Sequence, residues 1–575
     1  MPPGVPEEAE GVEEPEVDGE EDGPRPAALP DTPTVRSHPG ERLRIRLLQG
    51  SHEEQHGFVM HGTRWPREWH NPASVLVNQQ TLGISEVFTL DVDPAARSPY
   101  GPGDHLWRFN NIDDTWLGCW GLWRVALPGG DPAFPPLPEL VEPGAPVPVR
   151  AVPDRPPASD PSVRTFVVVA RRTEHRYAEN VLTDPWGLIY HPAAYDPAEH
   201  ATARETGEWR PATVHETGEP LVLRARRGEW VRLFLVNEVR RPDDEEDPDL
   251  PRFGVEPSPP LLPLEHVDDL GRPDRRTVTA RVSLHPSLLR YDVVSDDGAY
   301  VGVNRDGTVA PLPGDPGGGH DEHGGEVVER DGHALGHVRQ NWTEYWWYAD
   351  EALASAAAAD GPGQVCLLED LADVRNHRHH GLFGALVVEP PDITPFRPGS
   401  DRVEEAWWGI DAELCDDNLD LVAYEGVLFV QDGLRLFVNG HPDQPVPDVV
   451  PGDDPEDSGQ KGMSYRAVPI HRGRPPRGAD PGTPILSTRA GDRVWLRLVG
   501  AGDKPRNHSL NVHGVAMRPA PWVPNGWRLG AASGVSNGWV ETVVVDKLQQ
   551  GDHAVRTGAF RWGTEQGIWA LLRGL

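Results

Sequence analysis

Cysteine is scarce in this chain, and long apolar segments are missing. Among 575 residues there are only three cysteines, Cys119, Cys366 and Cys415, an odd number without metal-type spacing. Neither a disulfide framework nor a thiolate metal cage is therefore predicted. No apolar stretch approaches the length of about 18 residues that a membrane-spanning helix needs. The N-terminus has neither the basic nor the apolar block of a signal peptide, so we expect a cytoplasmic protein without a membrane partner.

Positive charge is also in deficit. The chain has 54 Lys and Arg residues against 90 Asp and Glu residues, a formal net charge of -36. The phosphate backbone of a nucleic acid would be repelled, which excludes nucleic acid as an expected partner. Residues 1–35 alone contain eleven acidic residues and eight prolines. Because such a segment is too polar to bury a core, residues 1–31 are predicted to form a disordered acidic tail.

Proline and glycine, by contrast, are abundant. There are 62 prolines and 61 glycines, whereas apolar residues make up only 37% of the chain. This composition favours short strands and many turns over long helices. We therefore predict an all-β protein, and its length leaves room for about three or four domains of ordinary size.

Two segments about 450 residues apart repeat the same motif. In each copy, a Gly-acid-Arg strand leads to a histidine, then four residues, then a His-Gly pair. The histidines of the first copy are His56 and His61, and those of the second are His508 and His513. Both copies end on a Gly-apolar-Trp sequence, so the likeness spans roughly 80 residues. We infer two related β-domains with histidines at fixed places.

Strand-like and proline-rich segments divide the chain. The first copy of the repeat occupies residues 32–126 and has no counterpart of residues 404–480, so we expect it to be a shortened β-domain. Residues 127–163 are rich in proline without a periodic pattern, which is typical of an extended linker. Apolar and β-branched runs bounded by Gly and Pro then predict a β-domain with insertions at 164–395 and another at 404–575.

Histidine is the metal-capable residue here, with 24 copies. His377 and His379 precede an apolar, strand-like run that begins at Gly381. On a strand these two histidines would face the same side, because successive side chains alternate. His285 stands in another strand-like segment, two residues before Ser287. These spacings are compatible with a metal site.

These segments resemble motifs of the multicopper oxidases, whose cupredoxin domains hold a copper cluster between the first and last domains. His377, Arg378 and His379, with the strand that follows them, resemble the His-x-His motif that closes the family's first domain. His285 is similar to the start of the other His-x-His motif, in which Ser287 stands in place of the second histidine.

The second copy of the repeat adds to the resemblance. His508, Asn511 and His513 resemble the family's His-x-x-His-x-His motif, with Asn511 at the middle ligand position. Amide oxygens bind copper less well than imidazole does, so that ligand is expected to be lost. The likeness is spread over residues 164–575. It implies multiple cupredoxin-like Greek-key β-sandwich domains, a copper cofactor, and a small-molecule substrate that is oxidised by dioxygen.

One motif of the family has no counterpart. Its His-Cys-His-x-x-x-His sequence would fall at residues 554–567, which contain neither Cys nor His. In the first copy of the repeat, Cys119 lies two residues before Gly121, too late to be the ligand. A blue copper centre needs a cysteine thiolate with two histidines. We therefore expect no type 1 copper centre, and the usual route of electrons into the cluster would be missing.

The resemblance implies a copper site with fewer ions than the family's cluster, mono- or dinuclear, between the second and last β-domains. Its predicted ligands are His285, His377, His379, His508 and His513. For His377 and His379 the alternative is a pair of histidines packed in a sandwich and hydrogen-bonded to backbone carbonyls, and His285 and His513 bind a metal only if the others meet them in space. His56 and His61 are interpreted as relics of the duplication rather than as ligands. The histidines around His320 lie in a Gly-rich segment, which fits a disordered insertion better than a metal-collecting loop.

Three functions are compatible with the sequence. The first is a copper-dependent oxidoreductase of multicopper-oxidase type without a type 1 centre. The second is a non-catalytic copper-binding or scaffold protein that kept the sandwich fold, since likeness of fold does not establish activity. The third is a chain that works with a partner chain or as an oligomer, because a shortened β-domain leaves strand edges that a partner could cover.

Overall fold

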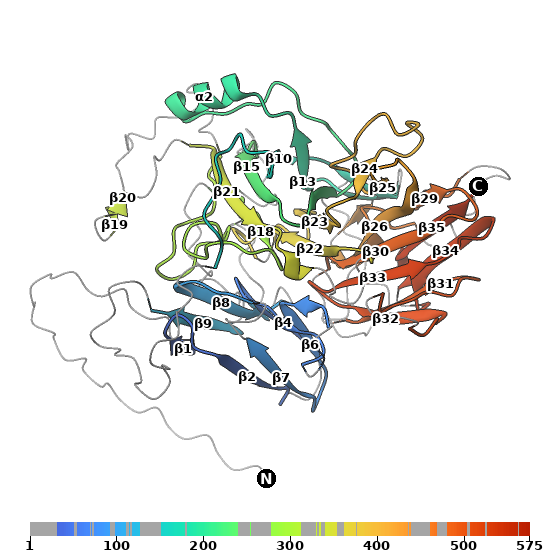
Figure 1. Cartoon of the computed structure of the whole chain (residues 1–575), viewed down its shortest axis with the longest axis horizontal. Helices are drawn as coiled ribbons and strands as arrows, with labels where there is room; N and C mark the ends of the chain where they lie inside the picture. The colour runs from blue at the N-terminus through green and yellow to red at the C-terminus, as the bar shows by residue number, and fades with distance from the viewer. Residues whose placement is uncertain are drawn as a thin grey trace, which may run out of the picture.

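The computed structural model of the protein describes most of the chain (Figure 1). The described residues are 32–50, 55–69, 71, 74–92, 98–110, 114–115, 118–126, 151–178, 181–239, 253–254, 278–311, 329–330, 333–334, 340–353, 361–374, 376–434, 436–438, 460–468, 480–502, 506–521, 523, 526–561 and 563–575. The predicted acidic tail, residues 127–150 of the predicted linker and the segment around His320 lie outside them.

Nearly all regular structure in the described residues is β-strand, which confirms the all-β class predicted from the proline and glycine content. The main exception is helix α2 (Pro197–Thr206). The Asp196 side chain caps its N-terminus by accepting a hydrogen bond from the Ala198 amide, and Gly207, with a φ of 81°, ends it. No helix in the described ranges has the length and apolar character needed to cross a membrane.

The first β-sandwich is the smallest (blue in Figure 1). In its β2 strand, exposed Arg44 and Arg46 alternate with more buried Leu43, Ile45 and Leu47, as expected for a strand with one face on a core. The strands of this sandwich are β1 (Thr34–Ser37), β2 (Leu43–Leu48), β3 (His56–Met60), β6 (Gln79–Leu82), β7 (Val87–Val92), β8 (Gly103–Phe109) and β9 (Trp120–Val125). They form a five-stranded sheet, β1-β9-β8-β3-β6, and a two-stranded sheet, β2-β7.

The second sandwich has two four-stranded sheets. Its strands are β10 (Val163–Arg172), β13 (Leu188–Ala193), β14 (Leu221–Arg226), β15 (Trp230–Asn237), β18 (His285–Pro286), β21 (Trp342–Tyr348), β22 (Gln364–Glu369) and β23 (Phe383–Glu389). The sheet orders are β13-β10-β15-β21 and β14-β23-β22-β18. Strand β23 is buried throughout, because Leu386 and Val388 face the core of this sandwich while Phe383 and Val387 face the next one.

The third sandwich contains the second copy of the repeat (red in Figure 1). Its strands are β24 (Thr394–Phe396), β25 (Asp411–Cys415), β26 (Leu421–Leu434), β28 (Gln460–Met463), β29 (Ile485–Thr488), β30 (Val494–Gly500), β31 (His508–Val512), β32 (Ala531–Val535), β33 (Val540–Val545), β34 (Gly551–Thr557) and β35 (Trp569–Gly574). One sheet runs β24-β25-β26-β30-β33 with β28 paired to β26, and the other runs β29-β35-β34-β31-β32.

Short elements complete the structure. They are β4 (Trp65–Pro66), β5 (Leu76–Val77), β11 (His175–Ala178), β12 (Leu182–Asp184), β16 (Phe253–Gly254), β17 (Val278–Thr279), β19 (Glu329–Arg330), β20 (His333–Ala334), β27 (Phe437–Val438) and the 3-10 helices η1 (Glu351–Leu353) and η3 (Thr564–Gln566). The sheet β11-β12-β27 joins strands of the second sandwich to one of the third.

The first and third sandwiches share a sheet topology. In the orders β1-β9-β8-β3-β6 and β29-β35-β34-β31-β32, the first strand pairs in parallel with the last strand of its sandwich. The other sheet differs, because β2 and β7 correspond to β30 and β33 but the described part of the first sandwich has no counterpart of β24, β25 or β26. The two copies of the repeat therefore keep one complete sheet in common.

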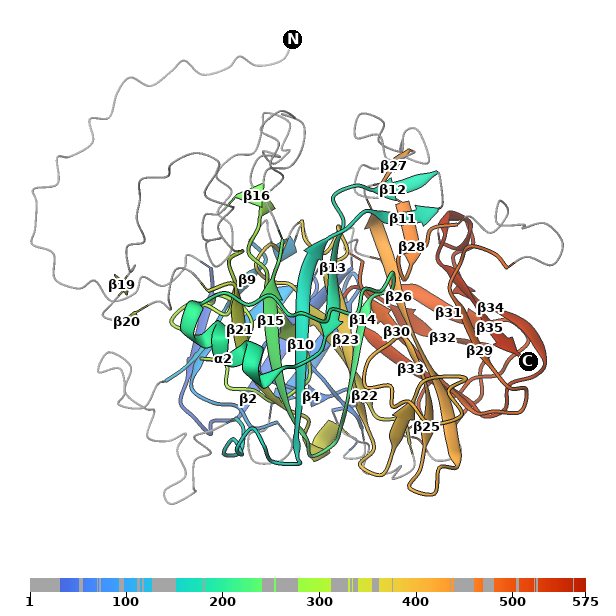
Figure 2. The ribbon, with the colours of Figure 1, turned by 90° about the horizontal axis from the view of Figure 1, so that it is seen from above.

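The second sandwich contacts both of its neighbours, in different ways. Figure 2 shows its β14 and β23 strands next to β26 and β30 of the third sandwich, and one apolar cluster, which includes Val222, Phe383 and Phe429, spans that contact. Towards the first sandwich the apolar cluster is much smaller, consisting of Leu106, Leu122, Ala299, Val301 and Leu371. Polar and charged side chains form much of the rest of that contact, and the candidate site lies among them.

Candidate functional site

Three buried side chains with metal-binding chemistry meet where the first and second sandwiches touch. They are His61, directly after β3, and His285 and Asp297 of the second sandwich, and their possible ligand atoms all lie within 4.8 Å of one another. The two imidazole rings stack, with centroids 3.8 Å apart and 23° between their planes. Within the described part of the chain, no other three His, Cys, Asp or Glu residues form such a group. We call these three residues the His61 group.

A glycine allows the turn that carries Asp297 to approach the strand that carries His285. The next residue, Gly298, has a φ of 71°, in the left-handed region. A Cβ atom at this position would lie 2.1 Å from the carbonyl oxygen of Leu284, so only glycine fits. As a result, Nδ1 of His285 donates a hydrogen bond to the backbone carbonyl oxygen of Asp297 at 2.7 Å.

The carboxylate of Asp297 holds His61. Both of its oxygens lie 3.1 Å from Nδ1 of His61. Burial lowers the pKa of His61 to about 4, although Asp297 opposes this shift, so the ring is neutral near pH 7 and donates from Nδ1. Burial would raise the pKa of Asp297, but His61 and His285 outweigh it and keep that pKa well below its usual range. The Nε2 atom of His285 is buried and has no hydrogen-bond partner.

An arginine faces the other side of the His61 ring. Nε of Arg108, on β8, lies 3.5 Å from Nε2 of His61, and the same guanidinium forms an ion pair with Glu369. Glu369 stands opposite His285 in the antiparallel pairing of β18 and β22, and Arg378 lies 3.1 Å from it. Burial would raise the pKa of Glu369, but Arg108 and Arg378 lower it to about 2. The contact therefore contains two ionised carboxylates and two arginines beside the imidazoles.

The predicted ligands His377 and His379 lie in a turn, so the alternation expected for residues two apart on a strand does not apply. Nδ1 of His377 lies 2.9 Å from Asp370, and Nε2 lies 2.8 Å from the carbonyl oxygen of Thr279. Burial would lower the pKa of His377, but Asp370 raises it to about 9. Near pH 7 a metal ion would therefore have to displace a proton from His377 and break one of these two hydrogen bonds. His379 is buried in the same turn.

The two predicted ligands of the last domain lie apart from the His61 group. Nε2 of His508 lies 2.9 Å from the buried carboxylate of Asp432. His513 is exposed, and its Nε2 accepts a hydrogen bond from Nε of Arg556 at 2.6 Å. Burial and the charge of Arg556 lower the pKa of His513. Of the five predicted ligands, the structure brings only His285 into a group of possible metal ligands.

The side chains present do not fit the copper cluster that the sequence resemblance implies. Such a cluster needs several neutral imidazoles whose free nitrogens point at shared ions. Here both ring nitrogens of His377 and one ring nitrogen each of His508 and His513 contact protein groups, and none of these three histidines belongs to the His61 group. The histidine that meets His285 is His61, which the sequence interpretation treated as a relic of the duplication.

Sequence reasoning missed Arg108 and Glu369, although a signal for the arginine was present. The pattern Gly-Asp-His-x-x-Arg at 103–108 recurs at 551–556. In the two copies, Nδ1 of this histidine lies 3.0 Å and 2.9 Å from the backbone carbonyl of the histidine that follows β3 or β31, and the arginine faces the ring of that same histidine. Glu369 had no such signal, because a single carboxylate at a strand end is not distinctive.

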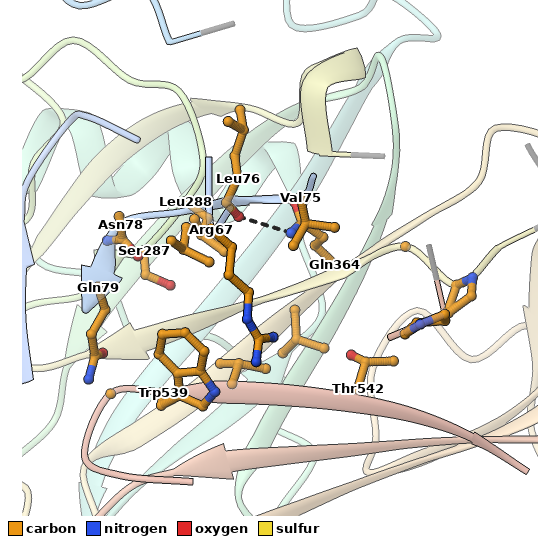
Figure 3. Close-up of a pocket in the computed structure, with 17 residues that line it drawn as sticks. Arg67, Val75, Leu76, Asn78, Gln79, Ser287, Leu288, Gln364, Trp539 and Thr542 are labelled. Atoms are coloured by element: carbon orange, nitrogen blue, oxygen red, sulfur yellow. Dashed lines mark hydrogen bonds between the residues drawn. The ribbon is translucent and has the colours of Figure 1, made fainter. Parts of the chain in front are cut away.

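A pocket of about 70 Å³ opens where the three sandwiches meet (Figure 3). On its wall, the guanidinium of Arg67 lies 4.9 Å from the ring centre of Trp539 and 3.3 Å from Glu541. Gln364 donates a hydrogen bond to the carbonyl oxygen of Leu76 at 3.0 Å. None of the described residues that line the pocket is His, Cys, Asp or Glu. The pocket wall thus offers neither a side-chain metal centre nor an acid-base pair.

Comparison with known proteins gives a weak likeness of fold. No protein-family model matches the chain, and no curated protein does. A solved multicopper oxidase is 12% identical with a TM-score of 0.37, over 72% of this chain and 89% of that one. A blue copper oxidase from Nitrosomonas europaea is 12% identical with a TM-score of 0.36, over 72% and 86%. A copper nitrite reductase from the same organism is 13% identical with a TM-score of 0.34, over 72% and 94%. These neighbours are copper proteins, but likeness at this level does not extend to function.

Proposed function

We propose that the chain is a non-catalytic scaffold protein built on cupredoxin-like sandwiches, rather than an oxidase. Support comes from the contact between the first and second sandwiches. Asp297 holds one side of the His61 ring, and Arg108 lies against the other. His61 is 0% exposed and Arg108 is 1% exposed, so neither side chain is open to solvent in the folded state.

One observation carries the proposal: the guanidinium of Arg108, ion-paired with Glu369, lies beside the only group of three possible metal ligands that the described residues form. A guanidinium remains protonated in proteins and has no lone pair to give. It therefore repels a metal cation and cannot replace a lost ligand. Its charge already compensates the carboxylate that would otherwise attract a metal ion.

The thiols support the same function. A type 1 copper centre needs a cysteine thiolate among its ligands. Burial raises the pKa of Cys366 well above its usual value, and burial with the charge of Asp114 raises that of Cys119. Burial also raises the pKa of Cys415. All three are free thiols that favour the protonated form.

Copper content and dioxygen consumption of the wild-type protein test the proposal. The protein would be refolded with Cu²⁺, freed of loosely held ions and assayed with ferrous ion and phenolic electron donors. We expect far less than one copper ion per chain and no dioxygen uptake above that of a heat-denatured sample. Copper-dependent dioxygen uptake by the folded protein would contradict the scaffold function.

The second candidate is a copper-dependent oxidoreductase of multicopper-oxidase type that lacks a type 1 centre. It is favoured by the buried Nε2 of His285, which has no partner and lies in a group with His61 and Asp297. Two imidazoles and a carboxylate are a donor set that copper accepts. His285→Phe separates the two candidates, because it would abolish copper binding and turnover in an oxidase but would change neither quantity in a metal-free scaffold.

A further inference from the structure

We infer that the guanidinium of Arg108 occupies a latent metal site. The site is formed by the Nε2 atoms of His61 and His285 and the carboxylate of Glu369, whereas Asp297 holds the Nδ1 side of the His61 ring. Once the guanidinium is removed, the site takes a single divalent transition-metal ion such as Cu²⁺ or Zn²⁺. The inference rests on the proposed scaffold function, in which the wild-type site holds no metal.

The contacts of Arg108 fix its charge at this position. Its Nε lies 3.5 Å from Nε2 of His61, its Nη1 donates to Oδ1 of Asn110 at 2.6 Å, and its Nη2 forms the ion pair with Glu369. Only 1% of Arg108 and 4% of Glu369 are exposed. A desolvated carboxylate needs a cation nearby, and this guanidinium supplies it.

The groups around Arg108 have the chemistry of metal ligands. Imidazole nitrogen and carboxylate oxygen both suit first-row divalent ions. Nδ1 of His285 is committed to the backbone carbonyl of Asp297, so the lone pair is on Nε2, the buried atom without a partner. A backbone hydrogen bond of this kind fixes the tautomer and the ring orientation of a metal-binding histidine.

Removal of Arg108 also leaves negative charge to compensate. Glu369 would then keep one arginine partner, Arg378, at 3.1 Å. Since a buried charge without a partner is strongly unfavourable, a divalent ion that enters the vacated space stabilises the contact. The side chain of Asn110 contacts both Glu369 and the guanidinium. Without the guanidinium, its Oδ1 atom can accept a hydrogen bond from a water molecule that is bound to the ion.

The second copy of the repeat supplies a matched control. Arg556 faces His513 as Arg108 faces His61, with Nε to Nε2 distances of 2.6 Å and 3.5 Å. His513 is exposed, and no group of three possible ligands forms around it within the described residues. The arginine of the second copy therefore covers no metal site.

Metal content of refolded variants tests the inference. Wild type, Arg108→His, Arg108→Ala and Arg556→His are each refolded with Zn²⁺ or Cu²⁺ alone, because a buried site must be loaded while the sandwiches associate. We expect about one ion per chain in both Arg108 variants and none held tightly by wild type or Arg556→His. Adding His285→Phe to Arg108→His should remove the ion.

Three outcomes would overturn the inference. The first is an Arg108→His protein that folds but holds no more metal than wild type. The second is stoichiometric metal in wild type that His285→Phe removes, since the site would then already hold an ion beside Arg108. If Arg108→His does not fold alone, Zn²⁺ should restore its thermal unfolding transition, and the third outcome is failure of Zn²⁺ to do so. Dioxygen uptake by wild type would contradict the scaffold function, but it would not decide whether the Arg108 variants bind a metal ion.

Discussion

The two copies of the repeat present the same histidine and arginine to different surroundings. His61 and Arg108 lie between two sandwiches and are 0% and 1% exposed, whereas His513 is exposed and Arg556 is half-buried. In each copy the arginine Nε faces the histidine Nε2. The pair is therefore common to both copies, and the copies differ in burial and in the carboxylates that the second sandwich brings to the first copy.

The comparison explains why the buried copy is expected to matter for stability. An exposed contact is screened by water and contributes little. A buried ion pair is unfavourable to break, because the remaining partner is left as an uncompensated charge in a medium of low polarity. The first sandwich also shares only a small apolar cluster with the second, so polar contacts carry more of that association.

The largest expected effect is on the buried ion pair. Arg108→Ala should lower the free energy of unfolding by about 3 to 5 kcal/mol, because it leaves Glu369 buried without this partner. Urea unfolding in the presence of a chelator would measure it. Arg556→Ala is the matched control, with an expected loss of about 1 kcal/mol or less. Equal losses in the two variants would remove the distinction between the copies.

The next effect is a pH dependence that belongs to His61. Its pKa of about 4 in the folded protein lies below the unfolded value of 6.5, so the unfolded chain binds the proton first as pH falls. The free energy of unfolding should decrease by about 3 kcal/mol between pH 6.5 and pH 4 through this residue. His61→Gln should flatten that part of the stability profile, and His513→Gln should leave it unchanged.

His377 should give the opposite pH dependence. Its pKa of about 9 in the folded protein lies above the unfolded value of 6.5, chiefly because Asp370 outweighs the effect of burial. The stabilising contribution is complete below pH 6.5 and is lost as pH rises to 9, a change of about 3 kcal/mol. NMR titration of the histidine signals would measure this pKa. A signal that titrates near pH 4 and is absent from the spectrum of His377→Gln would refute the ion pair.

The smallest effect concerns the exposed pair. His513→Ala and Arg556→Ala should each change the free energy of unfolding by about 0.5 to 1 kcal/mol or less, and their coupling in a double-mutant cycle should be of similar size. The same cycle on His61 and Arg108 should give a larger coupling. A coupling at His513 that matches the one at His61 would show that burial is not what separates the copies.

Much of the fold could be predicted from the sequence. Proline and glycine content indicated short strands, and the repeat indicated two related β-domains; the described sheets β1-β9-β8-β3-β6 and β29-β35-β34-β31-β32 have the same order. The absence of a counterpart for 404–480 pointed to a reduced first sandwich, and its second described sheet has only β2 and β7. These features depend on local pattern and strand period, which the sequence displays directly.

The candidate site could be predicted only in part. His285 was a predicted ligand and lies in the His61 group, but the sequence could not say which copy of the repeat docks against it, because that depends on how the sandwiches pack. The spacing of His377 and His379 predicted that they share one side of a strand, whereas they lie in a turn, with His377 beside Asp370. The ion pair of Arg108 with Glu369 joins residues 261 positions apart, a contact that no local pattern specifies.

The copper content of wild type and Arg108→His, refolded side by side with Cu²⁺ and stripped of loosely held ions, tests the central claim most directly. Wild type is expected to retain almost no copper, whereas Arg108→His is expected to retain about one ion per chain with the paramagnetic resonance of nitrogen-bound Cu²⁺. Stoichiometric copper in wild type, or none in a folded Arg108→His variant, would contradict it.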